Sequence, residues 1–315
     1  MTGSVRTGAQ EHFYLEGQAT VVYPGEGEVR VAASTQNPSL TQMVVARVLG
    51  VAASRVTVTV RRMGGGFGGK ESRSVPLSAV AAVAAWQTGR PVRLVLDRDQ
   101  DMMVSGWRHP FLGKYKVGFD STGRILAADI DLYNNAGWTM DLSFSVMERA
   151  MFHSENSYRV PALRVTGHCC KTNLPSNTAF RGFGGPQGML VCEDWVEAVG
   201  ARLGLAAEEV RRRNLYREGD ITHYNQRLVG CTLERCWAEC GRQAGLAQQL
   251  AAVKEFNNNN RWKKRGVAMV PVKFGIAFTA VHLNQNGRFP FSSSLNMTII
   301  HVDNSKSDHI QRTRE

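Results

Sequence analysis

Two glycine-rich loops constrain this chain more than any other feature, because each places a Phe among glycines beside a charged residue. They read GGGFGGKE over Gly64–Glu71 and FRGFGGPQG over Phe180–Gly188. Glycines at this density let the backbone adopt positive φ and approach a ligand closely, with N–H groups directed at an anionic or oxygen-rich group. Two such loops in one chain predict one large, charged cofactor that is held from both sides.

The first loop partly matches the phosphate-binding loop of nucleotide hydrolases. Gly64 and the pair Gly69–Lys70 satisfy GxxxxGK, but Glu71 stands where a Ser or Thr must hold Mg²⁺. In such loops the helix begins at the lysine, whereas Pro76 predicts a helix that begins several residues later. The pattern therefore argues against nucleotide hydrolysis, and a glycine-rich connection without a ligand is the remaining alternative.

Five motifs follow one another along the chain. They are STQNP (Ser34–Pro38), RMGGGFGGKE, SVMERA (Ser145–Ala150), KTNLPSNTAFRGFGGPQG (Lys171–Gly188) and VKFGIAFT (Val272–Thr279). In sequence and in order they resemble the molybdenum-cofactor portion of the xanthine dehydrogenase family of molybdenum hydroxylases. The resemblance runs from about Gln10 to about Gly287. It implies hydroxylation of an electron-poor ring carbon with oxygen from water, with molybdenum bound to molybdopterin as the electron acceptor.

The resemblance also implies which residues bind the cofactor. Gln36 resembles an amide side chain that donates a hydrogen bond to an oxo ligand of molybdenum, although without the resemblance it would be a polar turn residue before Pro38. The other expected cofactor contacts come from the two glycine loops, at Gly66, Phe67 and Gly68 and at Ala179, Phe180 and Arg181. Gln36, Phe67 and Arg181 are expected nearest the metal, through the ligands of the cofactor.

A second set of residues is expected to face the substrate. Glu71 and Arg149 are candidate catalytic and substrate-binding residues, at positions where xanthine dehydrogenases carry Glu and Arg and aldehyde oxidases typically carry apolar residues. This favours a purine, hypoxanthine or xanthine, since a carboxylate can hydrogen-bond a ring nitrogen and a guanidinium can neutralise charge on a ring oxygen. Phe183 and Phe278 resemble an aromatic pair that sandwiches the ring, and Thr279 a residue that hydrogen-bonds a substrate oxygen. An aldehyde oxidase-like hydroxylase and a non-catalytic binding protein are the alternatives.

The family implies that electrons pass through two 2Fe–2S clusters and FAD to NAD⁺ or oxygen, in a homodimer. The iron–sulfur and flavin domains and the family's carboxylate base have no counterpart in the sequence. We therefore expect a truncated molybdenum-cofactor domain that is inactive on its own and retains little or no cofactor.

Composition restricts the other function classes. No apolar run reaches the roughly 18 residues that a membrane span requires, and no signal peptide precedes the first motif, which favours the cytoplasm, with the peroxisome as an alternative. The net charge of +11 raises nucleic-acid binding as an alternative. However, the basic runs at Arg211–Arg213 and Arg261–Gly266 accompany no nucleic-acid motif. We expect neither nucleic acid nor a membrane as a partner.

The six cysteines are not expected to bind metal or to form disulfides. Cys231, Cys236 and Cys240 have a spacing that superficially resembles an iron–sulfur site, but Cys236 and Cys240 share one face of a predicted helix as small apolar residues. Cys169 and Cys170 are adjacent, so they cannot easily pair with each other.

Strands and helices alternate without regular βαβ order, which predicts an α+β fold with mixed sheets covered by helices. The expected strands are Ala19–Tyr23, Glu28–Ala33, Val56–Arg62, Pro91–Leu96, Lys114–Asp120 and Arg124–Leu132, the last two joined as a hairpin. The expected helices are Leu40–Leu49, Leu77–Trp86, Gly188–Leu203, Ala206–Asn214 and Leu233–Phe256. The predicted organisation is a first cofactor domain over 1–256, a linker and the start of a second domain over 257–302, and a disordered tail over 303–315.

Overall fold

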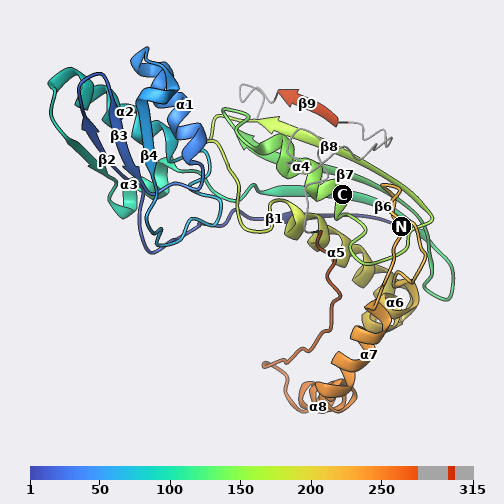
Figure 1. Ribbon diagram of the computed structural model, residues 1–315. Helices are drawn as coiled ribbons and strands as arrows, with labels where there is room; N and C mark the ends of the chain where they lie inside the picture. Colours follow the sequence, from blue (N-terminus) through green and yellow to red (C-terminus); the bar gives the residue numbers. More distant parts are fainter. Residues whose placement is uncertain (276–296, 302–315) are drawn as a thin grey trace.

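The computed structural model describes residues 1–275 and 297–301. Within them, two sheets that both contain parallel and antiparallel pairs are covered by helices, which confirms the predicted α+β fold (Figure 1). The four-stranded sheet has the order β4-β3-β2-β5. Its strands are β2 (Ala19–Pro24), β3 (Val29–Ala33), β4 (Val56–Thr59) and β5 (Val92–Val95).

Helices α1 (Pro38–Leu49) and α2 (Val75–Thr88) pack on this sheet. Helix α1 begins where the Asn37 side chain accepts a hydrogen bond from the Leu40 N–H and ends at Gly50, which adopts φ +70°. Fully buried side chains from the strands and both helices, including Val22, Val45 and Ala82, form the core. The short helix α3 (Arg98–Val104) follows β5.

The five-stranded sheet has the order β1-β6-β7-β8-β9. Its strands are β1 (Thr2–Thr7), β6 (Phe111–Phe119), β7 (Ile125–Gly137), β8 (Ala162–Lys171) and β9 (Met297–His301). Helices α4 (Ser143–Phe152) and α5 (Gly185–Leu203) cover one face, where Ile130, Met147 and Trp195 are fully buried. Because β1 belongs to this sheet while β2 to β5 form the other, the chain crosses between the sheets twice, and the glycine loops lie where it crosses (Figure 1).

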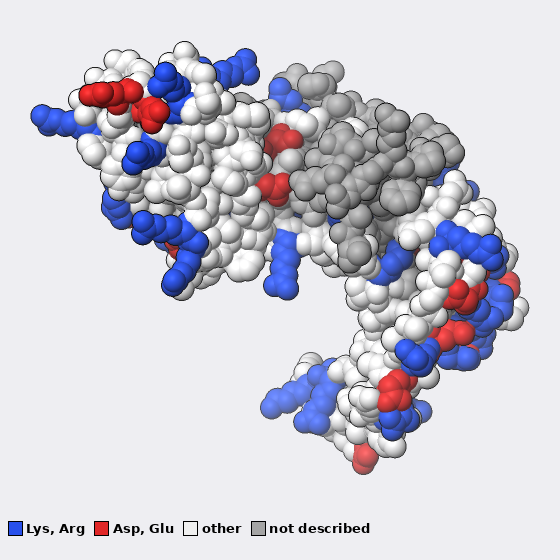
Figure 2. Space-filling model, in the orientation of Figure 1, with Lys and Arg blue, Asp and Glu red and all other residues white. Residues whose placement is uncertain are grey.

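Helix α6 (Ala207–Asn214) carries the first basic run, and its arginines are paired with acidic side chains. Arg211 is 1% exposed and contacts Glu193 at 2.8 Å and Glu197 at 2.9 Å, while Arg212 and Arg213 both contact Glu209. On the face in Figure 2, Lys and Arg alternate with Asp and Glu along this part of the molecule. The run is therefore largely neutralised rather than presented as a basic patch.

The single helix predicted over Leu233–Phe256 is wrong, because two helices, α7 (Leu233–Gln243) and α8 (Leu246–Asn259), occupy the segment. They are separated at Gly245, which adopts φ +59°, and they extend away from the sheets with no buried residue (Figure 1). Cys236 and Cys240 are exposed on α7 rather than packed in an apolar face. Helix α8 continues through Asn259, so the first residues of the segment 257–302, expected as a linker, are helical, and the boundary after residue 256 stays a prediction.

Among the described residues, no helix combines the length and the apolar composition needed to cross a membrane.

Candidate functional site

The two glycine loops lie against each other, as their sequences predict. The Arg181 N–H donates a 2.9 Å hydrogen bond to the Phe67 carbonyl oxygen. Gly68 adopts φ +98°, and a Cβ at this position would come within 2.5 Å of the Ala179 carbonyl oxygen. Only glycine permits this conformation and this approach without strain. The contact between the loops allows both of them to reach the same ligand. That they hold one cofactor stays a prediction.

Both loops place their Phe in the left-handed region, where non-glycine residues are uncommon. Phe67 and Phe183 each have φ of 51°. A backbone of this kind costs of order 1–3 kcal/mol and persists only when its surroundings impose it, and such residues concentrate at binding and catalytic sites. The two loops are thus related in conformation as well as in sequence.

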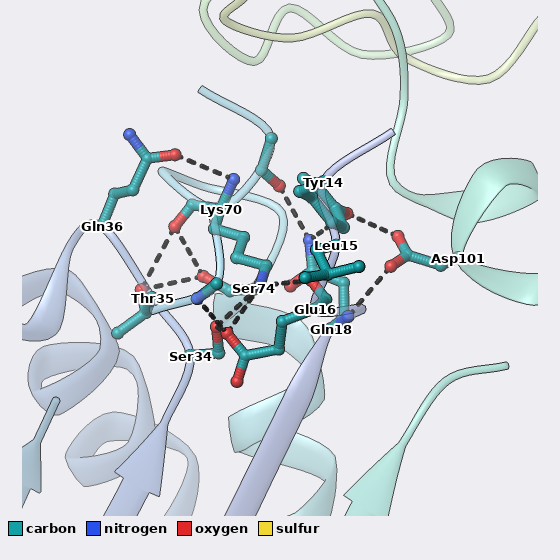
Figure 3. A network of polar contacts seen from close by, with 12 residues as sticks. Tyr14, Leu15, Glu16, Gln18, Ser34, Thr35, Gln36, Lys70, Ser74 and Asp101 are labelled. Carbon is teal, nitrogen blue, oxygen red and sulfur yellow. Dashed lines mark hydrogen bonds and ion pairs between the residues drawn. The ribbon is translucent and has the colours of Figure 1, made fainter. Parts of the chain in front are cut away.

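Gln36 follows β3 and fixes the first loop through its side-chain oxygen. The Oε1 atom accepts hydrogen bonds from the Gly68 N–H at 2.9 Å and from the Lys70 N–H at 3.2 Å. The amide nitrogen of Gln36 consequently points away from the loop (Figure 3). This orientation suits the predicted role of an amide donor to an oxygen atom of a cofactor.

Lys70, which a phosphate-binding loop would direct at its ligand, is buried beneath the first loop instead. Its side chain is 0% exposed, and its Nζ donates to the Glu16 carbonyl oxygen and to Ser34 Oγ, both at 2.7 Å (Figure 3). Burial lowers the pKa of Lys70, while the Glu16 carboxylate 3.3 Å away acts in the opposite direction. The loop therefore uses its lysine as an internal support, which agrees with the rejection of nucleotide hydrolysis.

Replacing Lys70 with Met is expected to loosen the first loop, because Ser34 and Glu16 lose their buried donor. A lost charge-assisted hydrogen bond of this kind costs about 1.5–3 kcal/mol. Hydrogen exchange of the Gly64–Gly69 amides should become faster. Lys116→Met removes an exposed lysine from β6 and is the matched control. Equal exchange in the two variants would contradict the supporting role.

The second loop is attached to α4, the helix that carries Arg149. Gly184 adopts φ +94°, and a Cβ there would lie 2.0 Å from the Val146 carbonyl oxygen. A Cβ on Gly188, one turn later in α5, would lie 2.3 Å from the Ala150 carbonyl oxygen. Two glycines thus let the start of α5 contact the backbone of α4 directly, which places the Phe183 loop beside Arg149.

Two residues that the sequence analysis missed support the second loop. The His12 ring stacks on Phe180 at 4.6 Å between centroids, and its Nε2 contacts the Ala179 carbonyl oxygen at 2.7 Å. The Arg108 guanidinium lies 3.9 Å from the Phe180 ring centroid and donates to the Arg181 carbonyl oxygen at 2.8 Å. Burial lowers the pKa of both side chains, that of Arg108 to about 10. Neither residue lies in one of the motifs, so no local pattern could have identified it.

The two charged residues expected to face substrate are both withdrawn from solvent. Glu71 is half-buried, and its burial together with the charge of Asp141 raises its pKa. Arg149 is 6% exposed, and burial lowers its pKa. Its guanidinium lies 4.9 Å from the ring centroid of Phe274, in the VKFGIAFT motif. Their roles toward a substrate stay predictions.

Phe278 and Thr279 lie outside the described residues, so the structure does not place them.

In the part of the chain that the structure describes, no three His, Cys, Asp or Glu side chains lie together as a metal site. Cys169 and Cys192 are buried, and burial raises the pKa of the Cys169 thiol to about 12.

The residues present fit the oxygen-rich cofactor that the sequence implies. Gln36 and Arg181 are exposed and Phe67 is 46% exposed, so the three residues expected nearest the metal are all accessible where the loops meet. Gln36 presents an amide donor. The absence of a side chain at Gly66 lets Gln36 lie directly against the first loop, because a Cβ on Gly66 would lie 2.5 Å from Gln36 Oε1.

Comparison with known proteins assigns the chain to a family. Residues 1–215 match the molybdopterin cofactor-binding domain. Xanthine dehydrogenase/oxidase of Felis catus is 56% identical over 91% of this chain and 22% of its own length, and that of Gallus gallus is 54% identical over 91% and 21%. The chain thus spans about a fifth of the length of these relatives. Among solved structures, the aldehyde oxidoreductase from Desulfovibrio gigas superposes with a TM-score of 0.74 and 27% identity, over 83% of this chain and 28% of that one. The chain belongs to the molybdopterin cofactor-binding domain family.

Proposed function

We propose that this chain binds molybdopterin at the junction of its two glycine loops and forms the adjoining side of the substrate pocket of a purine-oxidising molybdenum hydroxylase. The contact between Gly68 and Ala179, with the Arg181–Phe67 hydrogen bond, is the observation that carries the proposal, because it brings both predicted cofactor-binding segments to one place. When bound, the molybdenum centre supplies the electron acceptor for hydroxylation with oxygen from water.

The residues of this chain bind the cofactor, orient the substrate beside it and stabilise charge that develops on the substrate. Gln36 donates its amide N–H to an oxygen atom of the cofactor, and the backbone at Gly66–Gly68 and Ala179–Arg181 forms the two walls. Glu71 hydrogen-bonds a ring nitrogen of hypoxanthine or xanthine, and its raised pKa makes it a better proton acceptor. Arg149 stabilises negative charge that develops on a ring oxygen. Phe183, with Phe278 and Thr279, orients the plane of the ring.

We further propose that the complete enzyme converts hypoxanthine and xanthine to urate and passes electrons through 2Fe–2S clusters and FAD to NAD⁺ or oxygen. It would do so as a cytoplasmic homodimer, and the 315 residues alone would give no turnover. The names of the relatives support the substrate class. An aldehyde-oxidising hydroxylase is the second candidate, and the similarity to an aldehyde oxidoreductase structure favours it.

Replacing Glu71 with Gln distinguishes the two candidates. We expect kcat/KM for xanthine to fall about 10-fold or more, as one hydrogen bond to a charged group is worth about 1.5–3 kcal/mol. Oxidation of a small aromatic aldehyde should change less than about threefold, since it offers no ring nitrogen. Both rates are measured in a full-length form that carries these residues, with the exposed Glu28→Gln as the control. No loss for xanthine would favour the aldehyde-oxidising alternative, and an equal loss for both substrates would show a general structural role of Glu71 rather than a contact with the purine.

A further inference from the structure

A buried ion pair lies beside the proposed substrate pocket, and the proposed mechanism does not use it. Glu155 follows α4 with its side chain 0% exposed, and its carboxylate contacts the ammonium of Lys273, which is 19% exposed. The Nδ1 atom of His223 lies 3.0 Å from the second carboxylate oxygen. Burial alone would raise the pKa of Glu155, but the charge of Lys273, together with the contact with His223, outweighs it and holds the pKa below its ordinary value. A charge buried so completely requires such partners.

The ion pair joins segment 271–275 to the end of α4. Asn156 donates its Nδ2–H to the Pro271 carbonyl oxygen at 2.8 Å, and its Oδ1 accepts from the Lys273 N–H at 3.4 Å. The Lys273 ammonium also lies 5.0 Å from the ring centroid of Tyr224. An ion pair and two hydrogen bonds therefore join two short stretches of chain, 155–156 and 271–273, that are far apart in sequence, and the contact with Tyr224 adds a third point of attachment for Lys273.

Phe274 follows Lys273 directly and lies against Arg149. Its ring centroid is 4.9 Å from the Arg149 guanidinium carbon and 5.2 Å from the centroid of His153. Its edge also comes within 3.0 Å of where a Cβ on Gly185 would be. Burial lowers the pKa of His153 to about 4, so this ring is neutral near pH 7 and adds no charge next to the guanidinium. Phe274 is thus placed between α4 and the start of α5, where its face attracts the arginine.

We propose that the Glu155–Lys273 pair positions Phe274 on Arg149 and thereby sets the direction in which the guanidinium meets the purine. This inference rests on the proposed function, because it takes Arg149 as a substrate-facing residue. Glu155, Lys273 and Phe274 are positioning residues that act through Arg149. The consequence is that purine specificity depends on an ion pair that need not contact the substrate.

A mutant cycle in the full-length form tests the proposal. Lys273→Met and Phe274→Leu should each lower kcat/KM for xanthine about 10-fold, and Lys273→Arg should restore most of the loss. In an Arg149→Met background neither change should lower the rate further, because residues that act through one group are not additive. Phe274→Leu leaves the buried pair intact and replaces a side chain that is 50% exposed, so it separates positioning from failure to fold.

Limited trypsin digestion of the 315-residue chain gives a readout that needs no cofactor. Cleavage after Lys273 should be slow in the native chain and several-fold faster in Glu155→Gln, relative to cleavage in the exposed run 261–265, quantified by mass spectrometry. If Lys273→Met costs the same factor with and without Arg149, or if Glu155→Gln leaves cleavage unchanged, the inference is overturned. If Arg149→Met alone leaves xanthine turnover intact, the proposed function of Arg149 fails first, and the digestion still reports whether the pair holds the segment.

Discussion

Replacing Arg149 with Met is expected to lower kcat/KM for xanthine by about 100- to 1000-fold. Removing a preorganised donor from a water-excluded site commonly has an effect of this size, because the donor stabilises charge that develops in the transition state. Arg149 is 6% exposed and lies against the Phe274 ring, so its guanidinium is already desolvated and oriented before substrate binds. Urate formation by the full-length form measures the loss.

Met is chosen because it fills much of the arginine's volume without leaving an unpaired buried charge. The control is Arg164→Met, which removes an arginine whose side chain is 74% exposed from a surface pair with Asp129. Molybdenum content should stay unchanged in both variants, and aldehyde oxidation should fall far less than xanthine oxidation in the Arg149 variant. If both substrates lost activity equally, Arg149 would have a general structural role rather than a purine-specific one.

The parts of the site that the sequence predicts are those with a local pattern. Glycine density alone predicts that the loops carry positive φ and come close to a partner, and Gly68 and Gly184 do both. The mismatch at Glu71 likewise argues correctly against a phosphate loop, since Lys70 points into the protein. The support from His12 and Arg108 has no local pattern, because both act on a loop that the fold brings to them.

Most of the elements that the sequence does not predict depend on distant partners. Strand β1 is held by its pairing with β6, and most of its side chains alternate between partly buried and exposed. Helix α4 has no side-chain cap at its N-terminus, so packing against α5 and the sheet decides its existence. Strand β8 contains Gly167, His168 and two cysteines, which do not favour a strand by propensity. In α7–α8 a local signal was overlooked, because Gly245 ends the helix.

Replacing Gly184 with Ala is expected to be the most disruptive single-methyl change in the second loop. The new Cβ would meet the Val146 carbonyl oxygen at 2.0 Å, and the residue must also keep φ +94°. Strain of about 1–2 kcal/mol for the backbone and about 1–3 kcal/mol for overpacking gives a loss of about 2–5 kcal/mol. We expect a melting temperature lower by about 10 °C and little retained molybdenum.

Two matched variants separate the causes of that loss. Gly27→Ala imposes φ +72° with nothing within 4 Å, so it measures the backbone strain alone and should cost only about 1 kcal/mol. Gly188→Ala places a Cβ 2.3 Å from the Ala150 carbonyl oxygen at an ordinary helical φ, so it measures the clash alone. If Gly184→Ala lost no more stability than Gly27→Ala and kept its molybdenum, the close approach of α5 to α4 would not be what places Phe183 beside Arg149. We expect the loss of stability to be smallest in Gly27→Ala, intermediate in Gly188→Ala and largest in Gly184→Ala, which combines the backbone strain with the clash.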